Sequence, residues 1–328
     1  MTHPSAQPAR VVSSMIRPGV PRPVTGWRAK AFDLTGGRWN PGPSARERAV
    51  RAREEAIAAT LRGRHVTAFF CLKGGISKTS TTAATSIALS NLRPDPVLAL
   101  DANPDAGDLA ERLTGERVNG IVPLAREAQT ISSAAELGRF TRTVGRLTVL
   151  PGEPNPVLGD SLSAEDFRRV MQVVQRYYSM VQIDCGTGVT HPLMAGILSV
   201  ASTVVVPASW SITGAKRAAE TLEWLGENGY PQLANSAVVV LTAKEVVSRQ
   251  VDREAVLAHL GAAADLIVVP ADEHMADGAV IDWGALKPAT RDAYLEIAAA
   301  IVKRFPDPHA AATAAPISTM RSHAVALS

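Results

Sequence analysis

Short apolar runs and longer amphipathic segments alternate along most of this chain of 328 residues. The short runs have the length and the β-branched content of buried strands, and the segments between them have helical spacing. Strands that alternate with helices predict an α/β fold with a mainly parallel twisted sheet and helices on both faces. The predicted strands are 65–71, 96–101, 146–150, 180–184, 202–207, 236–242 and 265–269. The predicted helices are 79–92, 105–113, 163–178, 191–200, 212–228, 249–260 and 288–304.

The two ends of the chain lack this alternation. Residues 1–43 are rich in Pro, Arg, Gly and Ser without a period, which predicts a disordered N-terminal arm. Residues 44–62 are predicted to form a helix with Ser44 as its N-cap, leading into one α/β domain over 63–305. Residues 306–328 are rich in Ala with Pro and Ser, and are predicted to be a flexible C-terminal tail.

A glycine-rich segment lies between the first predicted strand and the first helix of the domain. Glycines allow the backbone to approach a phosphate closely, and the first turn of the helix offers N–H groups without helical acceptors. Lys78 can reach β- and γ-oxygens, and Thr79 offers a hydroxyl to Mg2+. We therefore expect a nucleoside triphosphate with magnesium here. The residues expected to contact it are Lys73, Gly74, Gly75, Ile76, Ser77, Lys78, Thr79 and Ser80.

The segment matches K-G-G-x-x-K-[ST], which resembles the deviant Walker A loop of the ParA/MinD family of P-loop NTPases (the SIMIBI class). The resemblance implies ATP as the nucleotide. It also implies an ATP-dependent homodimer in which Lys73 reaches the nucleotide of the partner. Ser77 occupies a position where the strict Walker A pattern has glycine, so a side chain is added at a tight turn. The alternative is an ordinary turn with a solvated lysine.

Two further segments lie in the order that this family requires. Asp101 ends an apolar strand at the start of D-A-N-P-D, which resembles switch I. Asp184 ends another apolar strand before C-G-T-G, as in a Walker B strand leading into switch II. The resemblance implies that Asp184, and also Asp101, hold Mg2+ through water. Carboxylates at strand ends also commonly cap the following helix, so that alternative stays open.

Switch I departs from the family at one catalytic position. The family has a second acidic residue there that orients the attacking water, and this chain has Asn103. A carboxamide can hydrogen-bond to water but cannot take a proton from it, so we expect slow hydrolysis. Lys73, Lys78 and Mg2+ would still supply positioning and charge neutralisation. Asp105 is the nearest carboxylate that could replace the missing one.

Two later loops resemble the segments of the family that contact the base. Thr242 ends a strand where the family often has an asparagine, and the loop Pro270-Ala271-Asp272 follows the next strand. An adenine contact at these residues is the expectation. Thr242 equally suits a simple capping role.

The composition restricts the remaining possibilities. The formal net charge is +3, and the basic residues concentrate in the first 64 residues, which suits nucleic acid, anionic lipid or an acidic protein partner. Two cysteines, Cys71 and Cys185, provide neither a disulfide framework nor the ligands of the iron–sulfur members of the class. The chain has no signal-peptide pattern and no apolar run of roughly 18 residues, which predicts a cytoplasmic protein without a transmembrane segment.

The motifs also resemble an actinobacterial subgroup of MinD/ParA-like proteins associated with type VII (ESX) secretion. The leading hypothesis is an ATP-driven dimerisation switch recruited to a membrane-bound secretion apparatus, with a protein partner bound through the arm or the switch regions. One alternative is a nucleotide-stabilised scaffold that hardly hydrolyses ATP. Another is a partition ATPase that binds DNA non-specifically through Lys287, Arg291, Lys303 and Arg304. A ligase or kinase is disfavoured, because His191 is the one nearby candidate for a second substrate.

Overall fold

The computed structural model describes residues 19–61, 63–72, 74–105, 107–243, 251–261 and 263–305. Lys73, the predicted tail and the first 18 residues of the predicted arm therefore lie outside the described residues. The chain forms two compact units, Met1–Arg53 and Glu54–Ser328, and each is described by itself.

The second unit contains an eight-stranded sheet in the order β3-β4-β2-β5-β1-β6-β7-β8. All neighbouring pairs are parallel except β3 and β4, which form an antiparallel hairpin at one edge. The predicted, mainly parallel sheet is confirmed. The hairpin strand β3 is a further strand that the sequence did not predict. The strands are β1 (His65–Phe69), β2 (Val97–Ala102), β3 (Arg142–Val144), β4 (Leu147–Leu150), β5 (Met180–Cys185), β6 (Thr203–Ser209), β7 (Val238–Thr242) and β8 (Asp265–Val269).

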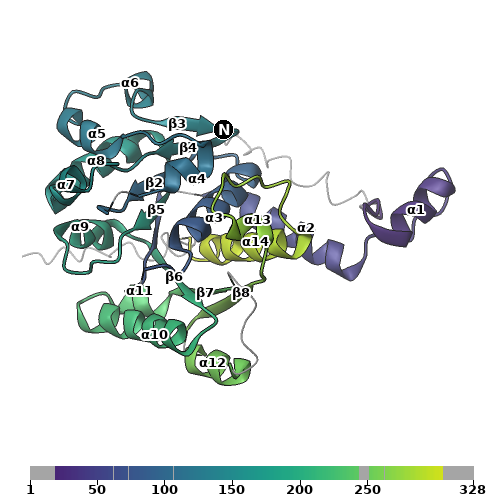
Figure 1. The fold of residues 1–328 in the computed structure, drawn as a ribbon. Helices are drawn as coiled ribbons and strands as arrows, with labels where there is room; N and C mark the ends of the chain where they lie inside the picture. Colours follow the sequence, from purple (N-terminus) through teal and green to yellow (C-terminus); the bar gives the residue numbers. More distant parts are fainter. Residues whose placement is uncertain are drawn as a thin grey trace, which may run out of the picture. The chain divides into compact units, whose positions relative to one another are not determined.

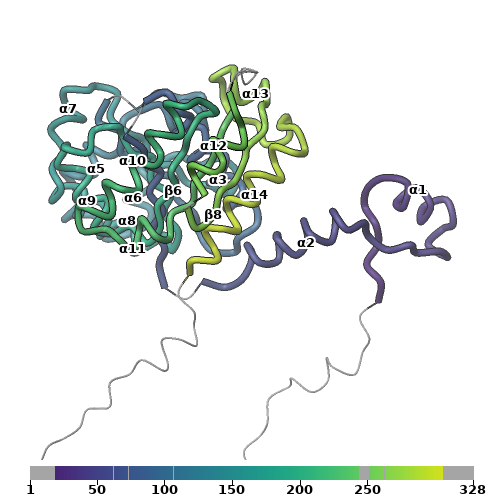
Figure 2. The backbone as a smooth tube through the Cα atoms, turned by 90° about the horizontal axis from the view of Figure 1, so that it is seen from below, coloured from purple at the N-terminus to yellow at the C-terminus, as the bar shows by residue number. Residues whose placement is uncertain are grey.

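Helices cover both faces of this sheet, as Figures 1 and 2 show. One face packs against α3 (Lys78–Leu92), α4 (Leu109–Thr114) and α14 (Pro288–Val302). The other face packs against α8 (Ala164–Tyr177), α9 (Pro192–Val200) and α10 (Ile212–Glu227). The shorter helices are α5 (Ile121–Glu127), α6 (Ala134–Gly138), α7 (Pro156–Asp160), α11 (Pro231–Asn235), α12 (Arg253–Leu260) and α13 (Glu273–Ala276).

The central strands are apolar on both sides because both faces are covered. Every residue of β1, β2, β5 and β7 is buried. The buried side chains form two clusters, one on each face of the sheet. This arrangement explains why the sequence shows continuous apolar runs and not an alternation of apolar and polar residues.

The order of the strands brings the three predicted motifs together. Strands β2, β5 and β1 are neighbours in the middle of the sheet, and all three run in the same direction. Asp101 pairs in register with Asp184, which pairs in turn with Phe69 near the end of β1. Because the carboxyl ends of parallel strands meet at one edge, the glycine-rich loop and both aspartates share that edge.

The first unit contains α1 (Gly26–Leu34), and α2 (Ala45–Ala58) begins in it. Helix α1 lies inside the stretch 1–43 for which the composition predicts no regular structure. Helix α2 corresponds to the predicted helix over 44–62. Ser44 Oγ accepts a hydrogen bond from Glu47 N, and Glu47 Oε2 accepts one from Ser44 N, which is the reciprocal arrangement of a capping box. Across the described parts of both units, no helix combines the length and apolarity needed to span a bilayer.

Candidate functional site

The loop between β1 and α3 has the backbone conformation of an anion-binding loop. Gly75 has φ +71° and Ser77 has φ +64°, so both residues are left-handed, and α3 begins at Lys78. Left-handed residues in such a loop turn neighbouring N–H groups toward one concave side. The first turn of α3 adds N–H groups without helical acceptors. The residues lining the cavity at this loop are Gly74, Gly75, Ile76, Ser77, Lys78, Thr79, Ser80, Asn103, Asp108, Cys185 and Thr187.

Ser77 shows why the strict Walker A pattern has glycine at its position. It is the non-glycine residue with a positive φ among the described residues, and its side chain makes no capping hydrogen bond. A left-handed conformation costs a residue with a Cβ about 1–2 kcal/mol. Thr81 Oγ1 donates to Ser77 O at 2.7 Å and so ties the strained residue to α3. Strain of this kind persists where the surrounding contacts fix it, as at many functional sites.

Asp184 at the end of β5 is buried against the first turns of α3. Its Oδ1 accepts a hydrogen bond from Thr82 Oγ1 at 3.2 Å. Its Oδ2 is buried and has no hydrogen-bond partner among the described residues. Burial raises the pKa of Asp184 above its usual range, and the neighbouring carboxylate of Asp101 raises it further. The Thr79 hydroxyl and the charge of Lys78 oppose this shift. A buried carboxylate beside these two groups suits a hard cation such as Mg2+.

Asp101 is also buried, but both of its oxygens are engaged. Oδ1 accepts from Asn103 N at 3.0 Å, and Oδ2 accepts from Leu109 N at 3.1 Å. Burial raises the pKa of this carboxyl, while these two hydrogen bonds oppose the shift. The carboxylate therefore closes the switch I segment onto the start of α4. This position is compatible with the predicted water-mediated contact to Mg2+, but the contacts present are structural.

Asn103 lines the cavity at the glycine-rich loop, and its carboxamide is engaged in its own loop. Asn103 Oδ1 accepts a hydrogen bond from Asp105 N at 3.2 Å, which closes a tight turn. Gly186 of the switch II segment packs against this turn, since a Cβ there would lie 3.0 Å from Asn103 Oδ1 and 2.9 Å from Pro104 Cδ. Asp105 is exposed and does not line the cavity. The structure thus brings Asn103 to the cavity and leaves Asp105 outside it.

Asp108 is a cavity residue that sequence reasoning missed. It stands at the N-cap position of α4, where an aspartate usually accepts a hydrogen bond from the helix, but its side chain makes no such bond. Asp101 takes the first free N–H of that helix instead. Asp108 lines the same cavity as Lys78 and Asn103, and its charge raises the pKa of both Asp101 and Asp184. The N-cap pattern alone predicts a structural role, so the place of Asp108 in the cavity could not be predicted from it.

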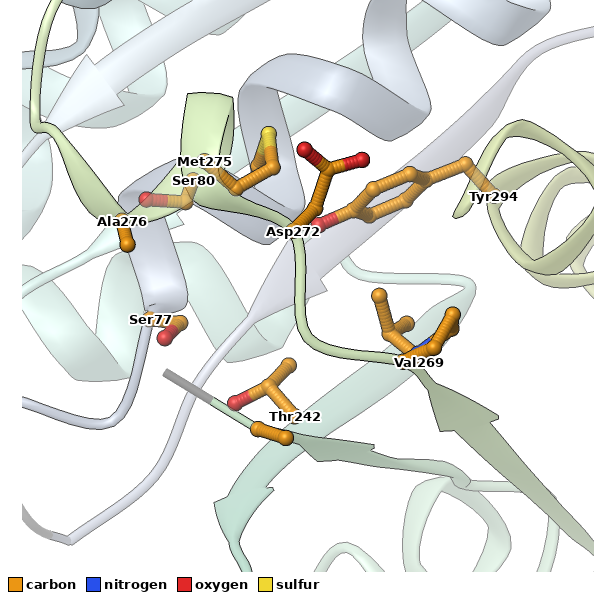
Figure 3. Close-up of a pocket in the computed structure, with 10 residues that line it drawn as sticks. Ser77, Ser80, Thr242, Val269, Asp272, Met275, Ala276 and Tyr294 are labelled. Atoms are coloured by element: carbon orange, nitrogen blue, oxygen red, sulfur yellow. The ribbon is translucent and has the colours of Figure 1, made fainter. Parts of the chain in front are cut away.

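A second cavity adjoins the loop on the side of β7 and β8 (Figure 3). Thr242 and Pro270 line it as the family resemblance predicts, and Ala271 does not. Thr242 Oγ1 donates to Ala208 O at 3.2 Å, so its hydroxyl hydrogen is used in a bond to the backbone. Asp272 also lines the cavity, but its oxygens accept from His274 N and Lys287 N at 3.1 and 2.8 Å. The other lining residues are Ser77, Ser80, Ala243, Val269, Met275, Ala276 and Tyr294.

Arg112 connects this second cavity to switch I. The side chain is buried and donates to Ser80 Oγ at 3.1 Å and to Met275 O at 3.3 Å. Since Arg112 lies on α4 four residues after Asp108, its buried cation contacts the wall of the second cavity from the helix that Asp108 begins. Its sequence context, an arginine in a short helix, does not indicate this position.

The remaining candidates have structural roles. His191 Nδ1 accepts from Leu193 N at 3.1 Å and caps α9, while its Nε2 lies 3.3 Å from Asp160 Oδ1. Cys71 and Cys185 are both buried and free. Lys303 and Arg304, at the carboxyl end of α14, lie 3.9 and 2.8 Å from Asp265.

This fold is that of the ParA/MinD ATPases. A ParA family ATPase from Chlorobium tepidum superposes with a TM-score of 0.63 at 18% identity, covering 72% of this chain and 98% of the other. MinD from Pyrococcus horikoshii, complexed with Mg-ADP, superposes with a TM-score of 0.58 at 20% identity, covering 72% of this chain and 94% of the other. The predicted resemblance in fold is thereby confirmed.

One relative has a considerably higher sequence identity. The chain is 34% identical over 284 residues to the ESX-1 secretion-associated protein EspI of Mycobacterium tuberculosis. The match covers 85% of this chain and 42% of EspI, so this chain spans less than half of that relative. No protein-family model matches the chain.

Proposed function

We propose that this protein binds ATP with Mg2+ and acts as an ATP-dependent dimerisation switch that hydrolyses ATP slowly. The observation that carries the proposal is the register of the central strands, which sets Asp101 beside Asp184 at the edge where the glycine-rich loop begins. The Mg-ADP bound by the MinD of similar fold supports the choice of ligand.

The roles of the residues follow from their positions. The backbone N–H groups of the loop and Lys78 would hold the phosphates. Thr79 and Asp184, the latter through water, would hold Mg2+, which supplies charge neutralisation on the phosphates when bound. Thr242 and Pro270 would contact the base, and the second cavity that they line, with a volume of about 20 Å³, would have to widen to admit it. Asn103 would orient water without taking its proton, which is the reason for slow turnover.

Dimerisation is tested by sedimentation of the purified chain with MgATP and with MgADP. We expect MgATP to convert the monomer to a dimer, and Lys73→Ala to prevent that conversion while leaving nucleotide binding within about threefold. Lys216→Ala removes an exposed lysine on α10 and serves as the matched control. An unchanged mass with MgATP, in a protein that binds MgATP by calorimetry, would count against the switch.

A scaffold that holds ATP without turnover is the second candidate, because the Asn103 carboxamide is engaged in a turn and provides no base. Asp108 is the carboxylate in the cavity that could orient the attacking water. In single-turnover hydrolysis we expect Asn103→Asp to raise the rate about tenfold or more, and Asp108→Asn to lower it by a similar factor. Nucleotide affinity should change little in either variant.

Asp105→Asn is the control for this pair, since Asp105 is exposed and lies outside the cavity. A loss of rate in this control would assign the water-orienting role to Asp105. No measurable hydrolysis in the wild type and in all three variants would favour the scaffold.

The similarity to EspI supports a role in type VII secretion. In this role the protein would be cytoplasmic and recruited to the membrane-bound apparatus, with a protein partner at the N-terminal arm or the switch regions. A ParA-like DNA-partition role is less well supported, since Asp265 lies close to Lys303 and Arg304. Retention on DNA that requires ATP and falls with salt would revive it.

A further inference from the structure

The first unit exposes apolar side chains more densely than the rest of the described chain. Nine large hydrophobic residues are exposed in the described residues, and five of them lie within the stretch 20–39. Single exposed apolar residues are normal, but a concentration of them indicates an interaction surface. The five residues, with their exposed fractions, are Val20 (63%), Val24 (69%), Trp27 (62%), Leu34 (91%) and Trp39 (53%).

These five residues, which we call the tryptophan surface, centre on Trp27 and Trp39. The rings of Trp27 and Trp39 are neighbours, with centroids 6.3 Å apart. Leu34 follows Trp27 by seven residues on α1, which places both on one side of that helix. The backbone of Val20 is tied to the residue after Trp39, because Asn40 Nδ2 donates to Val20 O at 2.7 Å.

Polar contacts hold this surface in place, so the apolar side chains are not needed for a core. Glu47 Oε1 accepts from the backbone N–H groups of Val24 and Thr25 at 2.7 and 2.9 Å. Arg28 Nη1 donates to Pro41 O at 2.9 Å and thereby joins α1 to the following loop. Helix α1 itself has no buried residue. The tryptophans are therefore available to a partner.

The charge around the tryptophan surface is strongly positive. Residues 19–53 contain eight Lys and Arg but only two acidic residues, Asp33 and Glu47. Asp33 pairs with Arg22 at 2.7 Å, and Glu47 is engaged with backbone N–H groups. Lys30 and Arg38 are exposed close to the two tryptophans in sequence. An occupant of this surface must therefore be anionic and must accept aromatic rings.

We propose that the tryptophan surface binds the interface of an anionic lipid bilayer. Tryptophan is favoured at the level of the headgroups, where its ring is buried and its N–H stays hydrated, and arginine and lysine are attracted to anionic headgroups. The guanidinium of Arg28 lies 5.2 Å from the centre of the Trp27 ring, so one contact can present a cation and an aromatic ring together. A bilayer meets both requirements over a broad surface, and its interface can also bury Leu34 and the valines. This proposal does not depend on nucleotide binding.

The test is flotation of the full-length protein with vesicles of phosphatidylcholine, with and without phosphatidylglycerol. We expect binding only to vesicles that contain phosphatidylglycerol, and we expect Trp27→Ser/Trp39→Ser to weaken it by about tenfold or more. Ile212→Ser removes an apolar side chain of the second unit that is even more exposed (78%) and should have no effect. Both substitutions change exposed residues, and unchanged thermal unfolding will verify that the variants remain folded.

Two results would overturn the proposal. One is equal binding by wild type and the double tryptophan variant, which would mean that charge alone attracts the chain. The other is an absence of binding to phosphatidylglycerol vesicles, including the case in which the protein is instead retained by duplex DNA.

Discussion

Asp184→Asn is expected to reduce ATP hydrolysis by about a hundredfold or more while raising the stability of the nucleotide-free protein at alkaline pH. The loss of activity follows because asparagine cannot supply the anionic oxygen that would hold Mg2+ through water. The gain in stability follows because the wild-type carboxylate is buried, and its Oδ2 has no partner in the described part of the chain. A single substitution would thus separate function from stability.

The pH dependence follows from the direction of the pKa shift. Burial raises the pKa of Asp184 in the folded protein, while the unfolded chain ionises near the usual carboxyl value of about 4. A raised carboxyl pKa leaves stability intact below the unfolded value and removes it as the pH climbs through the folded value. The wild type should therefore lose stability relative to Asp184→Asn as the pH rises from about 4 toward the folded value of about 8, and the difference should be smallest at the acidic end of the range.

Thermal unfolding of both nucleotide-free proteins between about pH 5 and about pH 9 will measure this difference. Glu227→Gln, which neutralises an exposed carboxylate at the end of α10, is the control and should follow the wild type. A variant that is less stable than the wild type at every pH would show that the carboxylate is compensated by a contact within the protein. Unchanged hydrolysis would remove Asp184 from the magnesium site.

The sequence predicted the strands that carry the motifs because each is an apolar run that ends in a chemically distinct residue. Strand β3 was missed because Arg142-Thr143-Val144 is short and half polar, and it is a strand only through its pairing with β4. Helices α6 and α7 were also missed, although their starts carry readable signals. Ser133 and Glu136 form a capping box, and Asn155 caps a helix whose first residue is proline.

In the site, too, features that depend on consecutive residues could be predicted, and features that depend on contacts between distant residues could not. The loop at Gly75 and Ser77 could be predicted because its chemistry lies within a few consecutive residues. Helix capping by Asp101 was one of the alternatives that its place at a strand end allowed, but its long-range contacts could not be predicted: Leu109 N lies eight residues away, and Gly152 packs against the carboxylate from the β4 side. Asp108 was missed for the same reason, since Asp101 takes over its capping role.

The second large effect is expected for Gly107→Ala, because Gly107 packs against the buried carboxylate of Asp101. A Cβ at Gly107 would overlap both carboxylate oxygens of Asp101. The carboxylate cannot swing away freely, because it is buried and accepts hydrogen bonds from Asn103 and Leu109. Relieving the overlap must displace either switch I or the start of α4. We expect a loss of about 2–4 kcal/mol in the free energy of unfolding and at least about a tenfold loss in hydrolysis.

Two further glycines extend this prediction to a series of three substitutions that can be ranked by their effect. A Cβ at Gly152 would lie 2.9 Å from Asp101 Cγ, a less severe overlap with the same carboxylate from the other side. A Cβ at Gly226, in α10, would meet nothing within 4 Å, so Gly226→Ala should leave hydrolysis unchanged and stabilise the protein by about 0.5–1 kcal/mol. Denaturant unfolding and single-turnover hydrolysis should therefore rank Gly107→Ala as most damaging, then Gly152→Ala, then Gly226→Ala. If Gly107→Ala were as stable and as active as wild type, Asp101 would not be the anchor of switch I, because its carboxylate would have room to move without consequence.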